Sequence, residues 1–450
     1  MSLSLIILAA GKGTRMQSEL PKVLHPVAGA PLVMHAIRGA QPLNPERIVV
    51  VAGHGAELVE ARVRADVPDV VVALQSEQLG TAHAVDQARS ALDTTSGDAI
   101  VLYGDTPFVG TDTLKAIRAA RQDGADVVVL GFAAAEPGKY GRLVVDNGRL
   151  ERIVEAKDAT PEELEINLCN SGVVAADRAV LFDLISNADN ANASGEYYLT
   201  DIVGIANARG LRCAVVICDE DETMGVNSRL DLAAAEAVFQ NRRRRRAMAE
   251  GATLTQPESV LFAHDTVLGR DVMIEPNVVF GPGVTVESGA TIRAFSHLEN
   301  CHVGRDAVIG PYARLRPGSR IGAGAKVGNF VETKNADVAA GAKINHLSYV
   351  GDADVGSGAN IGAGTITCNY DGVFKHHTRI GAGAFIGSNS SLVAPVEIGE
   401  NAIVGAGSTV TENVPDAALA LTRAQQQTKP GLGARIRQRL LALKAAGKRP

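Results

Sequence analysis

From residue 268 to about residue 415, a large apolar side chain recurs every six residues, and this spacing constrains the fold more than any other feature of the chain. A period of six matches neither an α-helix nor a simple alternating strand. It fits a solenoid in which each unit of six supplies one short strand and one corner, and three units close a coil. Stacked coils then bury a column of side chains that no single coil could bury. The predicted column is Leu268, Ile274, Phe280, Val286, Ile292, Leu298, Val303, Ile309, Leu315, Ile321, Val327, Val338, Ile344, Val350, Val355, Ile361, Ile380, Ile386, Leu392, Ile398, Val404 and Val410.

One insertion interrupts this rhythm. Thr367 occupies the slot after Ile361, but the next aliphatic slot, Ile380, comes seven residues late. We therefore expect a loop at residues 367–378, and loops that leave a regular scaffold commonly carry function. Polar and cationic residues precede it at neighbouring coils, and residues about eighteen apart lie one above another. The sequence thus predicts a polar patch beside the loop.

The first half of the chain alternates apolar runs with helical patterns, which favours a parallel sheet with crossover helices. Predicted strands are 3–8, 47–52, 70–74, 99–103 and 125–130, and predicted helices are 31–40, 56–64, 80–92 and 111–122. A further helix is expected at 228–250. The predicted fold is α/β plus a β-solenoid, with domains at 1–227 and 251–450 joined by the helix at 228–250.

Ligands of such sheets gather where the strands end. The first strand runs into Gly11-Lys12-Gly13-Thr14-Arg15-Met16, with Lys22 downstream. Glycines let backbone N–H groups approach a phosphate, and Arg15 and Lys22 add positive charge. The pattern is neither a dinucleotide fingerprint nor a Walker loop. Asp105 ends a later strand, where a carboxylate suits Mg²⁺, although a single Asp there is more often a turn or cap residue.

Net charge, cysteine content and the length of apolar runs bear on what class of protein this is. The net charge of −6 argues against generic nucleic-acid binding. Five cysteines without a CxxC pair indicate reduced thiols in a cytoplasmic protein. Since no apolar run reaches spanning length, membrane insertion is not expected. The five arginines at 242–246 favour a solvated linker helix over a nucleic-acid site.

Three strings carry a family resemblance: residues 8–16 (Leu-Ala-Ala-Gly-Lys-Gly-Thr-Arg-Met), 328–332 (Gly-Asn-Phe-Val-Glu) and 362–372 (Gly-Ala-Gly-Thr-Ile-Thr-Cys-Asn-Tyr-Asp-Gly). From about residue 4 to about residue 425 the chain resembles the bacterial bifunctional N-acetylglucosamine-1-phosphate uridylyltransferases and glucosamine-1-phosphate N-acetyltransferases. The resemblance implies a Rossmann-like nucleotidyltransferase domain, a left-handed parallel β-helix of hexapeptide repeats and a homotrimer. It also implies synthesis of UDP-N-acetylglucosamine, a precursor of peptidoglycan and lipopolysaccharide.

For uridylyl transfer, the resemblance implies UTP as co-substrate and Mg²⁺ held by Asp105 and Asn227. Arg15 and Lys22 would act in catalysis. The residues that would bind UTP and the sugar nucleotide are Leu8, Ala9, Ala10, Gly11, Lys22, Gln75, Gly80, Thr81, Tyr103, Gly104, Asp105, Gly141, Glu155, Asn170 and Asn227.

For acetyl transfer, the resemblance implies acetyl-CoA as co-substrate and His346 as the general base, a task suited to the pH range in which histidine titrates. Arg316 and Lys334 would hold the sugar phosphate, and Tyr349 and Asn360 would position the sugar. The acetyl-CoA groove, built between neighbouring subunits in the family, would be lined by Ala363, Asn369, Tyr370, Ser388, Ala406 and Arg423.

Two alternatives stay open at this level. The chain could be a monofunctional sugar-1-phosphate nucleotidyltransferase whose solenoid serves only as a trimerising scaffold. It could also bind nucleic acid through residues 242–246 and the basic tail at 431–450, which is expected to be helical at 436–445. The cluster of polar residues beside the inserted loop favours two enzymes on one chain over either.

Overall fold

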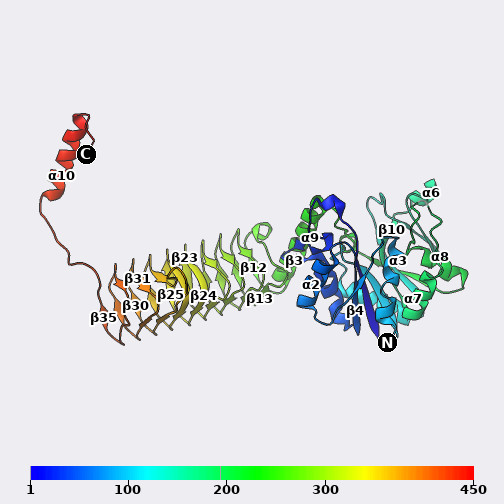
Figure 1. Ribbon diagram of the computed structural model, residues 1–450, viewed down its shortest axis with the longest axis horizontal. Helices are drawn as coiled ribbons and strands as arrows, with labels where there is room; N and C mark the ends of the chain where they lie inside the picture. The colour runs from blue at the N-terminus through cyan, green and yellow to red at the C-terminus, as the bar shows by residue number, and fades with distance from the viewer. Residues whose placement is uncertain (1, 193, 450) are drawn as a thin grey trace. The chain divides into compact units, whose positions relative to one another are not determined.

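The computed structural model describes residues 2–192 and 194–449. The chain divides into two compact units, one made of residues 1–246 with 262–264 and the other of 247–261 with 265–450. Figure 1 labels the elements of each unit, which are described separately below.

The first unit is built on a mixed sheet in the order β11-β7-β10-β6-β1-β4-β5. β1 is fully buried and pairs in parallel with both β4 and β6, whereas β10 runs antiparallel to β6 and β7. The strands are β1 (Leu3–Ala9), β4 (Arg47–Ala52), β5 (Val71–Leu74), β6 (Asp98–Tyr103), β7 (Val127–Ala133), β8 (Arg142–Asp146), β9 (Arg149–Val154), β10 (Leu168–Asp177) and β11 (Cys213–Cys218), with a small pair β2 (Pro26–Val27) and β3 (Ala30–Pro31). All five predicted strands are confirmed.

Helices cover both faces of this sheet, so the first unit has two apolar layers. The helices are α1 (Leu32–Ala40), α2 (Ala56–Asp66), α3 (Thr81–Asp86), α4 (Arg89–Leu92), α5 (Thr111–Gln122), α6 (Pro161–Leu164), α7 (Arg178–Ile185), α8 (Asp201–Ala208) and α9 (Arg229–Ala249). The predicted single helix at 80–92 is wrong, because the chain turns between α3 and α4. There Gln87 and Ala88 donate backbone hydrogen bonds to residues only three positions back, at Ala84 and Val85.

The second unit is the predicted solenoid, and its short parallel strands form three faces. Face 1 is the ten-stranded sheet β12 (Thr253–Leu254), β14 (Met273–Ile274), β17 (Thr291–Ile292), β20 (Val308–Ile309), β23 (Lys326–Asn329), β25 (Lys343–His346), β27 (Asn360–Ile361), β30 (Phe385–Ile386), β33 (Ile403–Val404) and β35 (Leu419–Ala420). Face 2 contains β15 (Val279–Phe280), β18 (His297–Leu298), β21 (Arg314–Leu315), β24 (Glu332–Val338), β26 (Tyr349–Val355), β28 (Ile366–Cys368), β31 (Ser391–Val393) and β34 (Thr409–Val410). Face 3 contains β13 (Val267–Leu268), β16 (Thr285–Val286), β19 (His302–Val303), β22 (Arg320–Ile321), β29 (Thr378–Ile380) and β32 (Val396–Ile398), together with the second halves of β24 and β26.

The predicted column is buried at every slot except the first. Leu268 is only half-buried, which corrects the prediction at that position. The reason is its place in the stack, because β13 pairs with β16 above it and starts its face. Most later slots have a paired strand on either side, which covers their side chains.

Two corners of the solenoid matter for function and are named here. Edge A lies where the chain passes from face 1 to face 2, and edge B where it passes from face 2 to face 3. The predicted loop leaves the coil at edge B, between β28 and β29. Beyond the coils the chain ends with α10 (Leu432–Ala445).

We expect the buried column to carry the stability of the second unit. Replacing Ile309, which is fully buried, with Ala should lower the free energy of unfolding by about 2–5 kcal/mol because it removes apolar contacts and leaves a cavity. The matched change Ile403→Ala removes a side chain that is 47% exposed on the same face and should cost much less. The shift in denaturation midpoint of the two variants measures the difference, and equal shifts would contradict the assignment of the column.

Candidate active sites

A cavity of about 260 Å³ lies at the carboxyl ends of β1 and β6 in the first unit. Its lining includes ten residues that the sequence predicted: Leu8, Ala9, Ala10, Gly11, Lys22, Gln75, Gly80, Thr81, Tyr103 and Asp105. It also includes Gln78 and Glu196, whose roles in a site the sequence did not reveal. The strand ends therefore converge as expected for a parallel sheet.

Lys22 organises the polar end of this cavity. Its ammonium group pairs with the Asp105 carboxylate and donates a hydrogen bond of 2.9 Å to Oδ1 of Asn227. Gly13 allows Lys22 to pack closely against the turn, because a Cβ at Gly13 would lie only 2.6 Å from Cβ of Lys22. Side-chain oxygens of Asp105 and Asn227, which are far apart in the sequence, thus both lie against the Lys22 ammonium group.

A second cavity of about 530 Å³ adjoins the first and shares Thr81, Tyr103 and Glu196 with it. It is lined by the predicted Glu155 and Asn170, and also by Lys139, Lys157, Tyr198 and Thr200. Burial raises the pKa of Glu155 above its ordinary value, and a hydrogen bond from Thr200 only partly offsets this. Burial also raises the pKa of Tyr103, so its hydroxyl remains protonated. The cavity combines hydrogen-bonding groups with a desolvated carboxyl group.

Four predicted residues stand outside both linings: Arg15, Gly104, Gly141 and Asn227, the last of which contacts Lys22 instead. Arg15 is exposed in the short 3₁₀ helix at Thr14–Met16. Gly104 and Gly141 lie behind the walls, since a Cβ on Gly104 would approach the Leu8 carbonyl oxygen at 3.2 Å and one on Gly141 would approach Glu155 at 3.4 Å. Gly141 therefore lies next to the partly buried Glu155 side chain.

In the second unit, edge A aligns the predicted base with the predicted acetyl-CoA residues. The strand register places Asn329, His346, Ala363, Ser388 and Ala406 at the same position in successive coils, two residues after the buried aliphatic residue. Arg423 reaches the top of this row, where it donates a hydrogen bond of 2.6 Å to the Ala406 carbonyl oxygen. Small side chains above His346 leave the row open.

Asn329 fixes the orientation of the His346 ring. Its amide oxygen Oδ1 lies 2.6 Å from Nδ1 of His346, so Nδ1 is the nitrogen that donates. The lone pair of the neutral ring then resides on Nε2. The string Gly-Asn-Phe-Val-Glu drew attention to Asn329, but only the register between β23 and β25 reveals its contact with His346.

Edge B gathers cations. Nη1 of Arg316 lies 2.8 Å from Oε1 of Glu332, and Lys334 lies beside Lys375 of the inserted loop, whose charge lowers the pKa of Lys334. Asp352 anchors the loop: its carboxylate accepts hydrogen bonds from Asn335 and Asn369 and lies 4.0 Å from the Lys375 ammonium. The sequence predicted Arg316 and Lys334 but missed Lys375 and Asp352, because their partners come from different coils.

Tyr349 bridges part of the face between the two edges. Its hydroxyl group lies over Gly351, where an added Cβ would come within 2.4 Å of the Tyr349 oxygen. Asn360, in contrast, belongs to β27 on face 1, and Asn369 and Tyr370 belong to edge B rather than to the row on edge A. One copy of the chain therefore does not bring all the predicted acetyl-transfer residues together.

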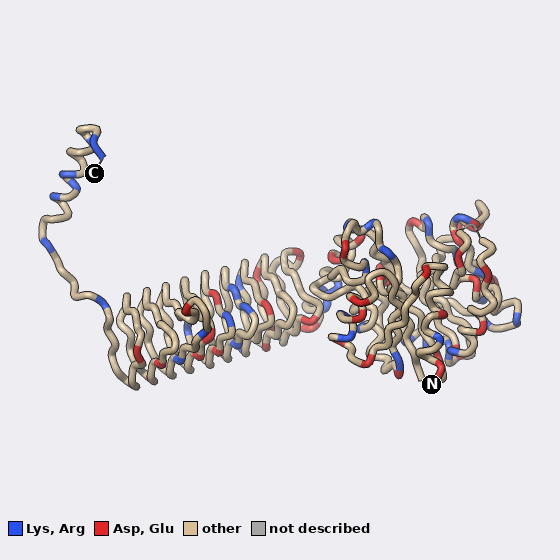
Figure 2. Tube along the Cα trace, in the orientation of Figure 1, with Lys and Arg blue, Asp and Glu red and all other residues tan. Residues whose placement is uncertain are grey.

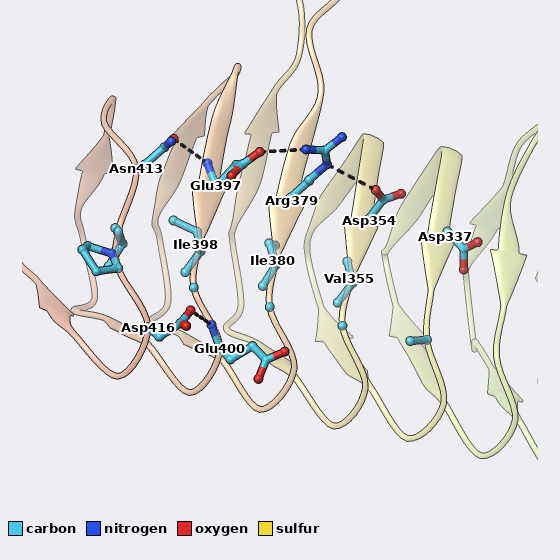
Figure 3. A pocket seen from close by; sticks show the side chains of 16 residues that line it. Asp337, Asp354, Val355, Arg379, Ile380, Glu397, Ile398, Glu400, Asn413 and Asp416 are labelled. Carbon is cyan, nitrogen blue, oxygen red and sulfur yellow. Dashed lines mark hydrogen bonds and ion pairs between the residues drawn. The ribbon is translucent and has the colours of Figure 1, made fainter.

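Face 3 carries a separate, open hollow of about 900 Å³ that contains none of the predicted site residues. Figure 3 shows Arg379 between Asp354 and Glu397 on neighbouring strands. Nη1 of Arg379 lies 2.8 Å from Oε1 of Glu397, and its Nε lies 3.9 Å from Oδ2 of Asp354. These charges therefore satisfy one another along the face.

At least two of the five arginines at 242–246 in α9 pack against aromatic rings. The Arg242 guanidinium lies 5.4 Å from the centre of the Phe108 ring, and that of Arg243 lies 5.2 Å from the centre of the Phe262 ring. These contacts pack this part of the helix against other residues of the first unit, so the run is not the fully solvated linker that the sequence predicted. Basic residues also mark the tail in Figure 2, and residues 417–449 contain no Asp or Glu.

Comparisons with known proteins match both halves. Residues 5–164 match the MobA-like NTP transferase domain. Residues 265–300, 300–335 and 377–412 match the bacterial transferase hexapeptide repeat. The chain is 61% identical over 449 residues to the bifunctional protein GlmU of Roseobacter denitrificans, with 100% of both chains covered. It is 59% identical over 446 residues to that of Dinoroseobacter shibae, with 99% of both covered.

The chain belongs to the bifunctional GlmU family. It is an enzyme that joins a nucleotidyltransferase to a hexapeptide-repeat acetyltransferase, and its second unit is a left-handed parallel β-helix. The alternative in which the solenoid is only a scaffold is thereby set aside. Within residues 2–192 and 194–449, no helix is long and apolar enough to span a membrane.

Glu155 should make the stability of the first unit depend on pH. Because burial raises the pKa of this carboxyl group in the folded state, folding favours its protonated form, and stability is lost as the pH rises from the ordinary Glu pKa through the raised one. We expect Glu155→Gln to raise the melting temperature of the first unit at pH 7. The gain should vanish when the pH falls below about 4.3. Thermal unfolding at several pH values measures this, and a pH-independent difference would contradict it.

Proposed function

We propose that the cavities of the first unit transfer a uridylyl group from UTP to N-acetylglucosamine-1-phosphate, and that the edges of the solenoid transfer an acetyl group from acetyl-CoA to glucosamine-1-phosphate. The product, UDP-N-acetylglucosamine, is a precursor of peptidoglycan and lipopolysaccharide. The observation that carries the proposal is that predicted residues from separate segments line adjoining cavities in the first unit and two edges of the solenoid in the second. The five free cysteines support a reducing compartment, and we place the enzyme in the cytoplasm.

In uridylyl transfer, a phosphate oxygen of the sugar phosphate attacks the α-phosphorus of UTP while the bond to the β-phosphate breaks and pyrophosphate leaves. This nucleophile is already anionic, so it needs no general base, and positioning with charge neutralisation provides the rate. Lys22 supplies a positive charge inside the cavity. Arg15, exposed on the adjacent 3₁₀ helix, would act at the entrance where the triphosphate arrives.

The donor set at Lys22 fits a magnesium ion. Asp105 and Asn227 offer a carboxylate and an amide oxygen that both point to the Lys22 ammonium, and Mg²⁺ prefers such hard oxygen ligands. When bound there, Mg²⁺ would neutralise phosphate charge. Gln75, Gly80 and Thr81 would then hold the nucleoside, and Glu155 and Asn170 the sugar hydroxyl and acetamido groups.

In acetyl transfer, the sugar amine attacks the thioester carbonyl carbon, the carbon–sulfur bond breaks and CoA leaves as the thiolate. Nε2 of His346 would take the proton that the amine loses, since Nδ1 is engaged with Asn329. Arg316, Lys334 and Lys375 would hold the sugar phosphate, because cations placed this close together are stabilised by a shared anion.

A homotrimer would explain the division of the site between the two edges. In a closed ring, edge A of each copy can face edge B of the next, which is a heterologous contact. His346 and the row at Ala363, Ser388 and Ala406 would then meet Asn369 and Tyr370 of a neighbour. Each groove for acetyl-CoA would thus need two copies.

Separated assays on the purified protein test the two activities. One supplies glucosamine-1-phosphate with acetyl-CoA and follows free thiol, and the other supplies N-acetylglucosamine-1-phosphate, UTP and Mg²⁺ and follows pyrophosphate. We expect both to proceed. Pyrophosphate without thiol release would reduce the solenoid to a scaffold.

His346→Ala should lower acetyl transfer about 100-fold or more, because it removes the proton acceptor, and should leave uridylyl transfer unchanged. The control His302→Ala removes a half-buried histidine on face 3 whose Nε2 lies 3.1 Å from Oε1 of Glu287, and should affect neither reaction. Loss of both activities in the His346 variant, or of neither, would refute the assignment.

Lys375→Ala should raise the KM for glucosamine-1-phosphate about tenfold while changing kcat less, because one charge-assisted contact to the phosphate is lost. Lys343→Ala removes an exposed lysine from face 1 and serves as the matched control. Steady-state kinetics at fixed acetyl-CoA distinguish the two variants. An unchanged KM would remove Lys375 from the phosphate site.

A further inference from the structure

The tail beyond the coils concentrates the positive charge of the chain. Residues 417–449 contain eight of the 44 Lys and Arg residues and none of the 50 Asp and Glu residues. Because the whole chain has a net charge of −6, the remainder of the chain is more acidic than the whole. An anionic partner would therefore be attracted by the tail, whereas the net charge of the remainder repels it.

The helix α10 presents this charge beside an apolar stripe. An α-helix turns by about 100° per residue, so side chains three, four, seven or eight positions apart share a face. Within an arc of about 80°, α10 carries four large aliphatic side chains, at Leu432, Ile436, Leu440 and Leu443. Leu432, Ile436 and Leu440 are 37%, 51% and 46% exposed, and Leu443 is half-buried. The described chain thus leaves most of this stripe open to water.

Cations border the stripe on both sides. By the same geometry, Arg435 and Arg439 lie along one border, and Arg437 and Lys444 lie along the other. All four side chains are exposed. Long basic side chains keep their aliphatic stems on an apolar surface while their charged ends reach outward. An apolar face with basic borders is typical of helices that lie at the boundary between lipid headgroups and acyl chains.

The length of α10 suits a helix that lies on a bilayer and does not cross it. Its 14 residues extend over about 21 Å, whereas the hydrocarbon core of a bilayer is about 30 Å thick. Residues 421–431, between β35 and α10, contain neither helix nor strand and can extend over at most about 40 Å. This segment includes the polar run 425–428 (Gln-Gln-Gln-Thr). A polar tether of that length lets α10 reach a surface without any change in the solenoid.

We propose that α10 binds the surface of an anionic phospholipid bilayer, with its apolar stripe between the acyl chains and its bordering cations at the headgroups, and so holds the enzyme at a membrane as a peripheral protein. A nucleic acid fits less well, because phosphate contacts need no aliphatic stripe, and residues 417–449 contain no aromatic residue on which a base could stack. A second α10 also fits less well, because the cations along both borders would face cations of the other helix. The proposal is independent of the two proposed reactions.

Co-sedimentation of the full-length protein with lipid vesicles tests this proposal. The wild type is mixed with vesicles of phosphatidylglycerol and phosphatidylcholine in equal parts, or with vesicles of phosphatidylcholine alone, at an ionic strength of about 0.15 M. We expect binding to the mixed vesicles and at least about tenfold weaker binding to the neutral ones, because several cations act together at the anionic surface.

Leu440→Gln and Leu441→Gln form a matched pair of variants at neighbouring positions. Both replace an exposed leucine, 46% and 58% exposed respectively, with a residue of good helix propensity. Only Leu440 lies in the stripe, since Leu441 lies about 140° away from its centre. Leu440→Gln should weaken binding to the mixed vesicles about tenfold, because one leucine no longer enters the apolar layer. Leu441→Gln should bind like the wild type.

A charge variant separates attraction to headgroups from burial of the stripe. Arg435→Gln combined with Arg439→Gln should weaken binding to the mixed vesicles about tenfold and leave binding to the neutral vesicles unchanged. Uridylyl transfer, acetyl transfer and circular dichroism, measured without vesicles, should match the wild type for every variant, which shows that the fold is intact.

A wild type that stays in the supernatant with both kinds of vesicle would overturn the proposal. Equal losses for Leu440→Gln and Leu441→Gln would overturn the stripe as the contact with lipid. A wild type that binds a short single-stranded RNA but not the mixed vesicles would assign the cations to nucleic acid and overturn the proposal as well. Loss of acetyl transfer in Leu440→Gln without vesicles would assign the stripe to a contact within the enzyme instead.

Discussion

Burial of the apolar column holds the second unit in register, and its chemistry depends on that register. Each coil contributes side chains such as Ile309 and Ile344 that are sealed only by the coils above and below. A side chain that slipped by one residue would point outward, so the column fixes every other position of the coil as well. Residues two places beyond the column therefore form a straight row along edge A. His346 is one of these residues, and its place beside Asn329 follows directly from the pairing of β23 with β25.

In the first unit, a parallel sheet rather than a solenoid brings the site residues together. Parallel pairing of β1 with β4 and β6 brings the ends of three strands to one edge of the sheet. There the glycine-rich turn leaves room for Lys22, and Lys22 in turn gathers Asp105 and Asn227. The partly buried Glu155, whose pKa is raised by desolvation, lines the second of the two adjoining cavities. A desolvated carboxyl group lowers stability but offers a strong hydrogen-bonding partner for the uncharged hydroxyl and acetamido groups of the sugar, a compromise common at binding sites.

The side chains along edge A differ between its two ends. The lower part of the edge carries stacked rings, and the upper part carries small residues beside His346. The loop on edge B, anchored by Asp352, keeps cations at the height of the same coils. Within one chain the two edges are separated by face 2, which explains why residues expected to share one ligand occur on different corners. A closed ring of copies would reunite them without any change in the fold.

The sequence by itself determined the architecture of this protein. A six-residue period over so many coils predicts a solenoid, and strand ends located the glycine-rich turn with Lys22 and Asp105, because both signals are local in the chain. The rest of the predicted nucleotide cavity came from the family resemblance. Two predictions from the sequence were wrong. Leu268 was expected to be buried but is half-buried, and residues 80–92 were expected to form one helix but form α3 and α4. Only the tertiary structure decided the partnerships: Lys22 with Asn227, His346 with Asn329, and Asp352 with Asn369 and Lys375 of the inserted loop. These contacts join residues from different strands or coils, and their distances depend on packing that no spacing in the sequence encodes.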